Sequence, residues 1–350
     1  MKRKKIILII SIIILLITMT FTVIWLIFST QIALSNAMTI EKLEDGLYSM
    51  EYNGNYGLDK FLEQGGAKSD EEIADFVTSY LSNGFYKTHT ESIEKDFGCS
   101  TLVATDSTGS TIMGRNYDWQ QCTAMIVHLK PENGYESIST TSLEFIGLDD
   151  SWNPNNITEK SKTLAAIYAP VDGINEKGLC IADLVAGDNE HTNQDTDKID
   201  ITTTMSIRLI LDKAATTEEA IELLKKYDMN SSINFAHHFA ISDASGKSVV
   251  VEYINNQIYV TETDVVTNHY LTEGKKYGVG FSGSEYRYES LLSIKENANG
   301  IMEMSDLKDA MRCVSSKGTT QWTIIYNTQT LAMDFYFRTQ FNKPYNYTLN

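Results

Sequence analysis

The stretch DFGCSTLVATDSTGSTIMGRNYDW, residues 96–119, places a cysteine directly after a glycine and follows it with an arginine and an aspartate. A turn at 105–109 (TDSTG) separates two β-branched runs, a pattern typical of a β-hairpin. The hairpin would fold its second strand back on the first and bring Arg115 and Asp118 alongside Cys99. We therefore expect a strand-rich fold that begins here.

Short β-branched and aromatic runs separated by Gly, Asn and Asp continue to the end of the chain. The runs are STLVATD, STIMGRNY, AMIVHLK, TLAAIYA, FAHHFAISD, SVVVEYINNQIYVTE, WTIIYN and LAMDFYFR. Four helices are expected among them, at 203–215, 217–227, 284–295 and 305–313. Runs of strands with clustered helices indicate an antiparallel α+β layered domain.

The N-terminus has a different character. MKRKK is followed by residues 6–28, which carry no charge and would span roughly 34 Å as a helix, enough for a bilayer core. The basic cluster predicts an N-inside signal-anchor, with the rest of the chain outside the cytoplasm. The alternative is a signal peptide cleaved near Ala37, after the small-x-small triplet SNA, which would give a secreted protein.

The region 29–98 differs from the strand-rich part that follows. Two charged segments, 38–50 and 69–82, suggest helices, and Ser69 and Glu72 have the spacing of a capping box. The sequence therefore divides into a membrane segment at 1–28, a helical segment at 29–98 and a strand-rich domain at 99–350.

Composition excludes several classes of function. The formal net charge of −17 argues against a nucleic-acid partner, which requires a basic face, and no zinc or P-loop motif is present. Four cysteines are too few for a disulfide scaffold in 350 residues. Cys180, in an apolar run, is expected to be a buried small residue.

Cys99 is a candidate nucleophile with an unusual source of base. If the Gly98–Cys99 peptide bond is cleaved, Cys99 gains an α-amine with a pKa near 8, which can accept a proton at neutral pH. Gly98, without a Cβ, would tolerate the close approach that self-cleavage needs. Arg115 could lower the thiol pKa and Asp118 could hold the α-ammonium. The alternative is a structural Arg115–Asp118 ion pair beside an inert buried thiol.

The pattern C-S-T-L-V-A-T-D-x-x-G-x-x-x-x-G-R-N-Y-D-W resembles the start of the mature chain in N-terminal-nucleophile amide hydrolases of the choloylglycine hydrolase group. That group includes bile salt hydrolases, penicillin V acylases, acid ceramidase-like enzymes and acyl-CoA:6-aminopenicillanate acyltransferases. The resemblance covers 99–350 and continues through GINEKGLCIADL, HHFAISDASGKSVVVEY, VVTNHY and SGSEYR. It implies an αββα sandwich of two antiparallel sheets.

The resemblance also implies roles for five residues. Cys99 would be the nucleophile and, through its amine, the base, while Asp118 would hold the amine and Arg115 would support the thiolate and substrate. Asn268 would donate to an oxyanion hole, and Arg287 would complete the site. Taken alone, Asn268 could close a strand-end turn and Arg287 could be a surface helix residue.

The sequence departs from the bile salt hydrolase pattern at one position. Ten residues after Asn175 that pattern has another Asn, and this chain has Val185. The change is harmless if only the backbone of that position serves the oxyanion hole. Asn175 itself is expected in a turn. His237, His238 and His269 lack convincing metal spacing and are expected to be strand or turn residues.

The 98 residues before Cys99 resemble the precursors of the acyltransferase and acid ceramidase-like relatives. We therefore expect 29–98 to be a pro-segment, cleaved from the catalytic domain at Gly98–Cys99. The expected activity is cleavage of a linear, non-peptide C–N amide bond of a small N-acyl compound through a thioester, with no metal and no organic cofactor. Acyl transfer to an amine is the nearest alternative, and a silent surface-anchored binding protein is another. A homo-oligomer is left open.

Overall fold

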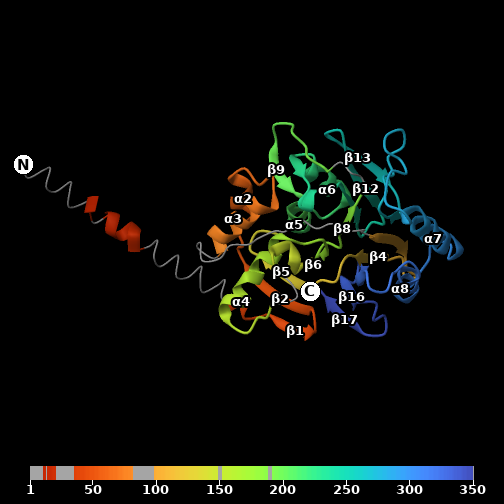
Figure 1. Cartoon of the computed structure of the whole chain (residues 1–350), viewed down its shortest axis with the longest axis horizontal. Helices are drawn as coiled ribbons and strands as arrows, with labels where there is room; N and C mark the ends of the chain where they lie inside the picture. The colour runs from red at the N-terminus through yellow and green to blue at the C-terminus, as the bar shows by residue number, and fades with distance from the viewer. Residues whose placement is uncertain are drawn as a thin grey trace, which may run out of the picture.

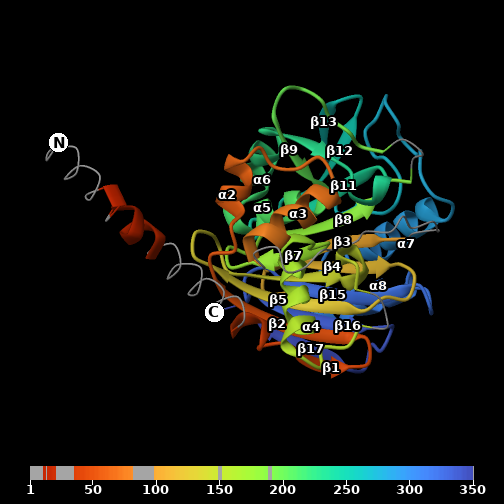
Figure 2. The same cartoon turned by 60° about the vertical axis from the view of Figure 1, so that its left-hand side comes forward.

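The computed structural model describes residues 11–12, 14–20, 35–81, 98–148, 152–187 and 191–349. Two β-sheets lie against each other, and helices cover their outer faces (Figure 1 and Figure 2). Apolar side chains fill three interfaces: between the sheets, between the larger sheet and its helices, and between the smaller sheet and its helices. These layers confirm the αββα sandwich that the resemblance implies. The expectation of two antiparallel sheets was wrong in one place, because β2 (Leu47–Gly54) pairs in parallel with β5 (Ala124–Pro131).

Nine strands form the larger sheet, in the order β1 (Glu41–Glu44), β2 (Leu47–Gly54), β5 (Ala124–Pro131), β6 (Ser137–Ser142), β7 (Asp172–Asn175), β8 (Cys180–Val185), β11 (His237–Ser242), β12 (Ser248–Ile254), β13 (Gln257–Glu262). Six form the smaller sheet, in the order β14 (Val265–Val266), β3 (Ser100–Thr105), β4 (Thr111–Asp118), β15 (Thr320–Asn327), β16 (Ala332–Phe337), β17 (Pro344–Thr348). A separate parallel pair joins β9 (Ile199–Thr202) and β10 (Tyr227–Asn230).

Helices α5 (Thr203–Lys213) and α6 (Thr217–Leu224) pack on the larger sheet, and α7 (Ser284–Asn297) and α8 (Met304–Cys313) pack on the smaller one. The other described helices are α2 (Leu58–Glu63), α3 (Asp70–Leu81), α4 (Ile157–Lys162), and the 3-10 helices η1 (Leu143–Ile146), η2 (Thr163–Tyr168), η3 (Ser232–Asn234). The four helices predicted in the strand-rich region are confirmed. Thr216 caps α6 as its spacing to Glu219 suggests, accepting from the Glu219 N–H at 3.2 Å.

Two sequence predictions were wrong. The segment 38–50 is not helical, because its side chains alternate: Tyr48, Met50 and Tyr52 are buried on one face of β2. The run TLAAIYA is not a strand but η2, in which all six residues are buried, so no periodicity marks its type.

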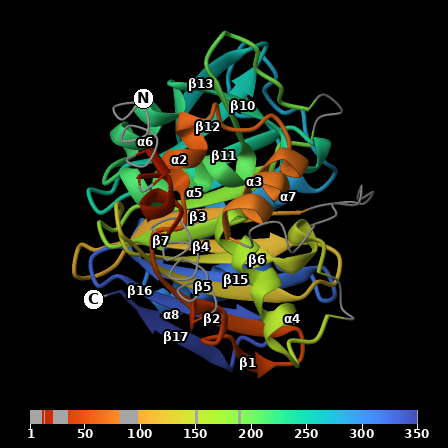
Figure 3. The ribbon, with the colours of Figure 1, turned by 90° about the vertical axis from the view of Figure 1, so that its left-hand side faces the viewer.

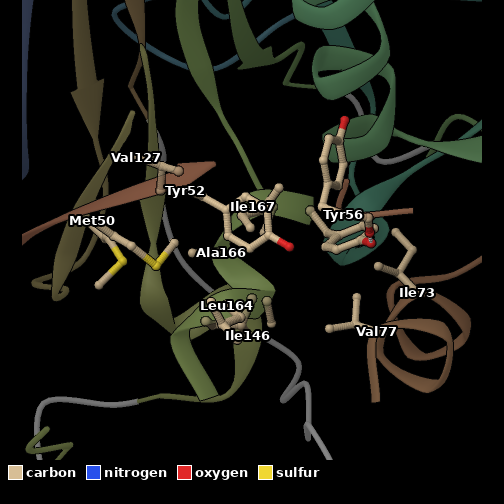
Figure 4. Close-up of a cluster of buried hydrophobic side chains, with 14 of the residues drawn as sticks. Met50, Tyr52, Tyr56, Ile73, Val77, Val127, Ile146, Leu164, Ala166 and Ile167 are labelled. Atoms are coloured by element: carbon tan, nitrogen blue, oxygen red, sulfur yellow. Dashed lines mark hydrogen bonds between the residues drawn. The ribbon is translucent and has the colours of Figure 1, made fainter. Parts of the chain in front are cut away.

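The segment 35–81 is part of the folded body, not a helical appendage before it. Strand β2 pairs in parallel with β5 along its whole length. Helix α2 lies beside α5 (Figure 3), where Asp59 pairs with Lys213, and α3 packs against η2. This segment supplies eleven of the 27 described buried members of one apolar cluster, and Figure 4 shows Ile73, Val77 and Tyr56 among them. Helix α3, predicted at 69–82, is confirmed.

The predicted membrane segment at 6–28 lies mostly outside the described residues. Its described parts, 11–12 and 14–20, are helical and exposed. In the part of the chain that the structure describes, no helix is long and apolar enough to cross a membrane.

Candidate active site

Cys99 lies immediately before β3, at the end of the hairpin that the sequence predicts. Antiparallel pairing of Ser100 with Asn116 and of Thr101 with Arg115 sets the register, which places Cys99 opposite Tyr117. Since alternate residues share a face of a sheet, Cys99, Arg115 and Tyr117 all face the interior between the two sheets. Cys99 is buried, with 4% of its surface exposed.

Arg115 is a fully buried cation held by the neighbouring sheet. Its Nε lies 2.6 Å from Oδ2 of Asp172, and its other nitrogens donate to the backbone carbonyls of Asn116 at 2.7 Å and Asp183 at 2.8 Å. Burial raises the pKa of the Cys99 thiol, and the Arg115 charge lowers it, with a net increase above its ordinary value. The thiol of the intact chain therefore needs a base to become a nucleophile at neutral pH.

Asp118 lies on the opposite face of β4 from Arg115, next to the backbone before Cys99. Thr320 donates a hydrogen bond to its Oδ1 at 2.5 Å. A Cβ placed on Gly98 would lie 3.1 Å from Oδ2 of Asp118 and 3.1 Å from Nη1 of Arg287. Burial raises the pKa of Asp118 to about 6, although Thr320, Arg287 and Arg115 all act to lower it. Gly98 is thus the residue that fits between these two side chains.

Asn268 links the backbone nitrogen of Cys99 to Arg287. Oδ1 of Asn268 accepts from the Cys99 N–H at 2.6 Å and from Nη2 of Arg287 at 2.7 Å. Arg287 also donates from Nε to Oγ of Ser100 at 3.2 Å. The sequence assigned the Cys99 nitrogen to Asp118 and an oxyanion contact to Asn268, whereas in the intact chain Asn268 is the hydrogen-bond acceptor of that nitrogen.

The structure brings all five predicted site residues together, because β14 pairs with β3 and places the loop after Val266 beside Cys99. Val185 takes part through its backbone: Nδ2 of Asn268 donates to its carbonyl at 2.7 Å. The side chain at this position therefore does not orient Asn268. Asn175 ends β7 and its Oδ1 accepts from the backbone of Lys177 and Leu179, so it makes the expected turn.

Sequence reasoning missed several residues around the site. Asp172 and Thr320 hold Arg115 and Asp118 from distant strands, and the only local signal was a polar residue in a buried run. The Tyr117 hydroxyl is buried without a hydrogen-bond partner among the described residues. His237, on β11 as expected, lies 2.8 Å from Asp183 through Nδ1, and this charge raises its pKa although burial lowers it.

The structure has a buried cysteine at the first strand of an αββα sandwich. Acidic, basic and amide side chains lie around the backbone next to this cysteine, an arrangement that resembles N-terminal-nucleophile hydrolases. Residues 99–271 match the family model described as linear amide C–N hydrolases, choloylglycine hydrolase family. This part of the chain is similar to that family.

Individual proteins are also similar to this chain. A bile salt hydrolase/transferase of Lactiplantibacillus plantarum is 28% identical over 166 residues, which cover 45% of this chain and 48% of the relative, so the match spans about half the length of that protein. Crystal structures of two variants of the conjugated bile acid hydrolase from Clostridium perfringens share the fold, with TM-scores of 0.52 and 0.50 at 17% and 16% identity. The similarity covers 71% and 72% of this chain and 92% of each structure.

Proposed function

We propose that this chain is the precursor of a cysteine amidase that cleaves a linear, non-peptide C–N amide bond of a small N-acyl compound. One observation carries the proposal: Asn268, Arg287 and Asp118 gather around the backbone on either side of the Cys99 nitrogen, not around its thiol. Such an arrangement suits a free amine at that position. The match of residues 99–271 to the linear amide C–N hydrolase model supports the reaction class.

In the proposed reaction, the α-amine of Cys99 takes the thiol proton and the sulfur attacks the amide carbon. The tetrahedral oxyanion would be stabilised by Nδ2 of Asn268, a donor of a kind that is worth roughly 3–4 kcal/mol. The amine then protonates the leaving nitrogen, and a thioester remains on Cys99. Water, activated by the same amine, releases the acid.

The free amine requires cleavage between Gly98 and Cys99, which we propose is autocatalytic. The Cys99 thiol would attack the Gly98 carbonyl carbon, transfer that acyl group from nitrogen to sulfur, and release it to water. The contacts of Gly98 with Asp118 and Arg287 support this step, because even a methyl group at residue 98 would press on both side chains.

The pro-segment would remain bound after cleavage. Eight of its large side chains are buried in the shared cluster: Tyr48, Met50, Tyr52, Tyr56, Leu58, Phe61, Ile73, Val77. At about 1.5–3 kcal/mol each, their burial contributes on the order of 10–20 kcal/mol before the entropy of ordering is subtracted. Tyr56 also donates to Asp212 at 2.5 Å, and Ser232 donates to Asp70 at 2.8 Å.

We also propose that the N-terminal segment is retained as a single-pass anchor, with the catalytic domain outside the cytoplasm. Residues at the alternative cleavage site support retention. Ala37 is fully buried, and Asn36 exchanges two hydrogen bonds with the backbone of Asn53, at 3.0 and 3.1 Å. Cleavage near Ala37 would remove Asn36 and its contacts with β2.

Acyl transfer to an amine is the second candidate, since the relative from Lactiplantibacillus plantarum is named both hydrolase and transferase. Both reactions share the thioester and differ in the acceptor. A folded binding protein without turnover is the third.

Intact-mass analysis of the purified protein tests the proposal first. A fragment that begins at Cys99 is expected, and Cys99→Ala should leave the chain whole. A panel of chromogenic aryl, short-alkyl and long-alkyl amides, with and without an added amine, then separates hydrolysis, transfer and binding. Full-length protein that turns over a substrate would refute self-processing, and processed protein inert toward every acyl amide would favour the binding protein.

A further inference from the structure

The carboxamide of Asn268 lies on a loop, residues 267–272, that connects β14 to the segment before α7. This side chain makes three contacts at the site, two through Oδ1 and one through Nδ2. A loop residue cannot hold a catalytic amide in place by its own backbone alone, because productive geometry requires placement within about 0.5 Å. The loop therefore needs external support, and the structure provides it from the larger sheet.

His238 and Glu252 form that support. They are direct cross-strand partners on β11 and β12, both side chains are fully buried, and Nδ1 of His238 lies 3.3 Å from Oε1 of Glu252. On its other side, Nε2 of His238 lies 2.8 Å from the carbonyl oxygen of Thr267, the residue directly before Asn268. Each ring nitrogen thus faces an oxygen atom, so the ring links the Glu252 carboxylate to the backbone of the loop.

Glu252 accepts hydrogen bonds from the other end of the same loop. Its Oε1 accepts from the Leu271 N–H at 2.8 Å, and its Oε2 accepts from the N–H of Thr272 at 2.8 Å and from the hydroxyl of Thr272 at 2.5 Å. Burial alone would raise the pKa of Glu252, but these donors and His238 hold it below its ordinary value, so the carboxylate stays ionised.

We propose that His238 and Glu252 are positioning residues that clamp both ends of loop 267–272 and so fix the Asn268 carboxamide against Cys99. The pair touches neither Cys99 nor the site of the scissile bond. It acts through the backbone on either side of Asn268, at Thr267 before it and at Leu271 and Thr272 after it. This inference rests on the proposed function.

A second set of contacts carries the same constraint to Arg287. The hydroxyl of Thr267 donates to the backbone carbonyl of Ser284 at 3.1 Å, and Nδ1 of His269 lies 2.8 Å from Oγ of Ser284. Ser284 begins α7, one turn before Arg287. Displacement of Thr267 would therefore move both Asn268, which accepts from the Cys99 N–H, and Arg287, which donates to Asn268.

Two substitutions at one position separate the two bonds of the clamp. In His238→Gln the ε-amide reaches the place of Nε2 and can keep the bond to Thr267. In His238→Asn the δ-amide takes the place of Nδ1 and can keep the bond to Glu252 only. His128→Gln is the matched control, because His128 on β5 pairs with Glu136, the residue before β6, at 2.6 Å and outside this clamp.

The experiment measures kcat and KM of the processed enzymes on the best amide of the panel, together with the rate of Cys99 alkylation by iodoacetamide. His238→Asn should lose roughly 10- to 100-fold in kcat and in alkylation rate, with KM within about two-fold, the scale expected for a small misplacement. His238→Gln should recover most of this loss, Glu252→Gln should lose as His238→Asn does, and His128→Gln should match the wild type.

Equal losses in His238→Asn and His238→Gln, in folded proteins of similar melting temperature, would overturn the clamp, as would a wild-type rate in His238→Asn. If the wild type hydrolyses no amide, the proposed function fails while the order of alkylation rates still decides the clamp. An alkylation rate that is the same in all variants would then refute it.

Discussion

Asp118 offers a quantitative test, because its environment makes ionisation costly in the precursor. Burial raises its pKa from 3.8 to about 6. A shift of about two units corresponds to about 3 kcal/mol of differential stability between the two protonation states. We predict that Asp118→Asn, made in a Cys99→Ala chain that stays intact, increases the free energy of unfolding at pH 7 by up to this amount.

The sign follows from proton binding. Between about pH 4 and pH 6 the unfolded chain has released the Asp118 proton and the folded chain has kept it, so stability falls as pH rises. Below pH 4 the carboxyl is neutral in both states and this contribution to stability is fully present. Above about pH 6 it is lost. The Asn side chain does not titrate, and its Oδ1 can still accept from Thr320, so the substituted chain avoids the loss.

The assay is urea unfolding of both full-length chains in mild detergent, at several values between pH 4 and pH 8. The difference in free energy of unfolding should grow across pH 4–6 and level off above it, which separates titration from any pH-independent effect of the substitution. A pH-independent difference would refute the reasoning. In the active Cys99 background the same substitution should lower turnover about 10²-fold or more, since it removes a positioned acid–base partner.

Three further predictions test other parts of the structure. Tyr117→Phe should leave the free energy of unfolding in urea unchanged or about 1 kcal/mol higher, because the hydroxyl it removes is buried without a partner; a clear loss would reveal a partner. Tyr56→Phe should lower the urea concentration at which the segment 35–81 dissociates from the processed chain, because buried Asp212 loses a hydrogen-bond donor. The expected loss of binding free energy is about 1–3 kcal/mol. An unchanged urea concentration would mean that the apolar contacts alone hold the segment. Protease added to intact cells should remove the catalytic domain, and full protection would refute the proposed topology.

The sequence predicts well those features that depend on neighbouring residues. The hairpin at the nucleophile and the capped helix α6 follow from turn residues and side-chain caps within a few positions. The arrangement of β2 beside β5 could not be predicted in this way, because the pairing joins residues more than seventy positions apart. The charged residues at 41–45 favoured a helix at 38–50, although the alternation of Tyr48, Met50 and Tyr52 is typical of a strand.

The residues of the candidate site also differ in whether neighbouring sequence predicts them. Motif spacing predicts Cys99, Arg115 and Asp118, which share one hairpin. It does not reveal Asp172 or Thr320, whose contacts arise only when distant strands assemble. His238 is on β11 as expected, but its pairing with Glu252 and the loop depends on cross-strand register, which no single segment specifies.

In the intact chain both Cys99 and Asp118 have raised pKa values, and cleavage at Gly98 would supply the cation that Asp118 lacks. The thiol has a raised pKa because of burial, and Asp118 is a buried carboxyl whose ionisation is unfavourable. Hydrolysis of the Gly98–Cys99 bond produces the α-ammonium of Cys99 and a carboxylate on Gly98, and it frees Gly98 to move away from Asp118 with its new charge. A cation within hydrogen-bonding distance lowers the pKa of a carboxyl, so the cost of ionising Asp118 should disappear in the processed enzyme.

The expected fall in the pKa of Asp118 on cleavage can be measured by NMR. The ¹³C shift of the Asp118 carboxyl, assigned by its loss in Asp118→Asn, should titrate near 6 in the Cys99→Ala precursor and clearly lower in the processed wild type. The substitution at Cys99 should not supply the difference by itself, because in the intact chain burial, Thr320, Arg287 and Arg115 shift the pKa of Asp118 and the thiol does not. The same pKa in both forms would mean that the new amine does not reach Asp118, and the base would then be held by Asn268 alone.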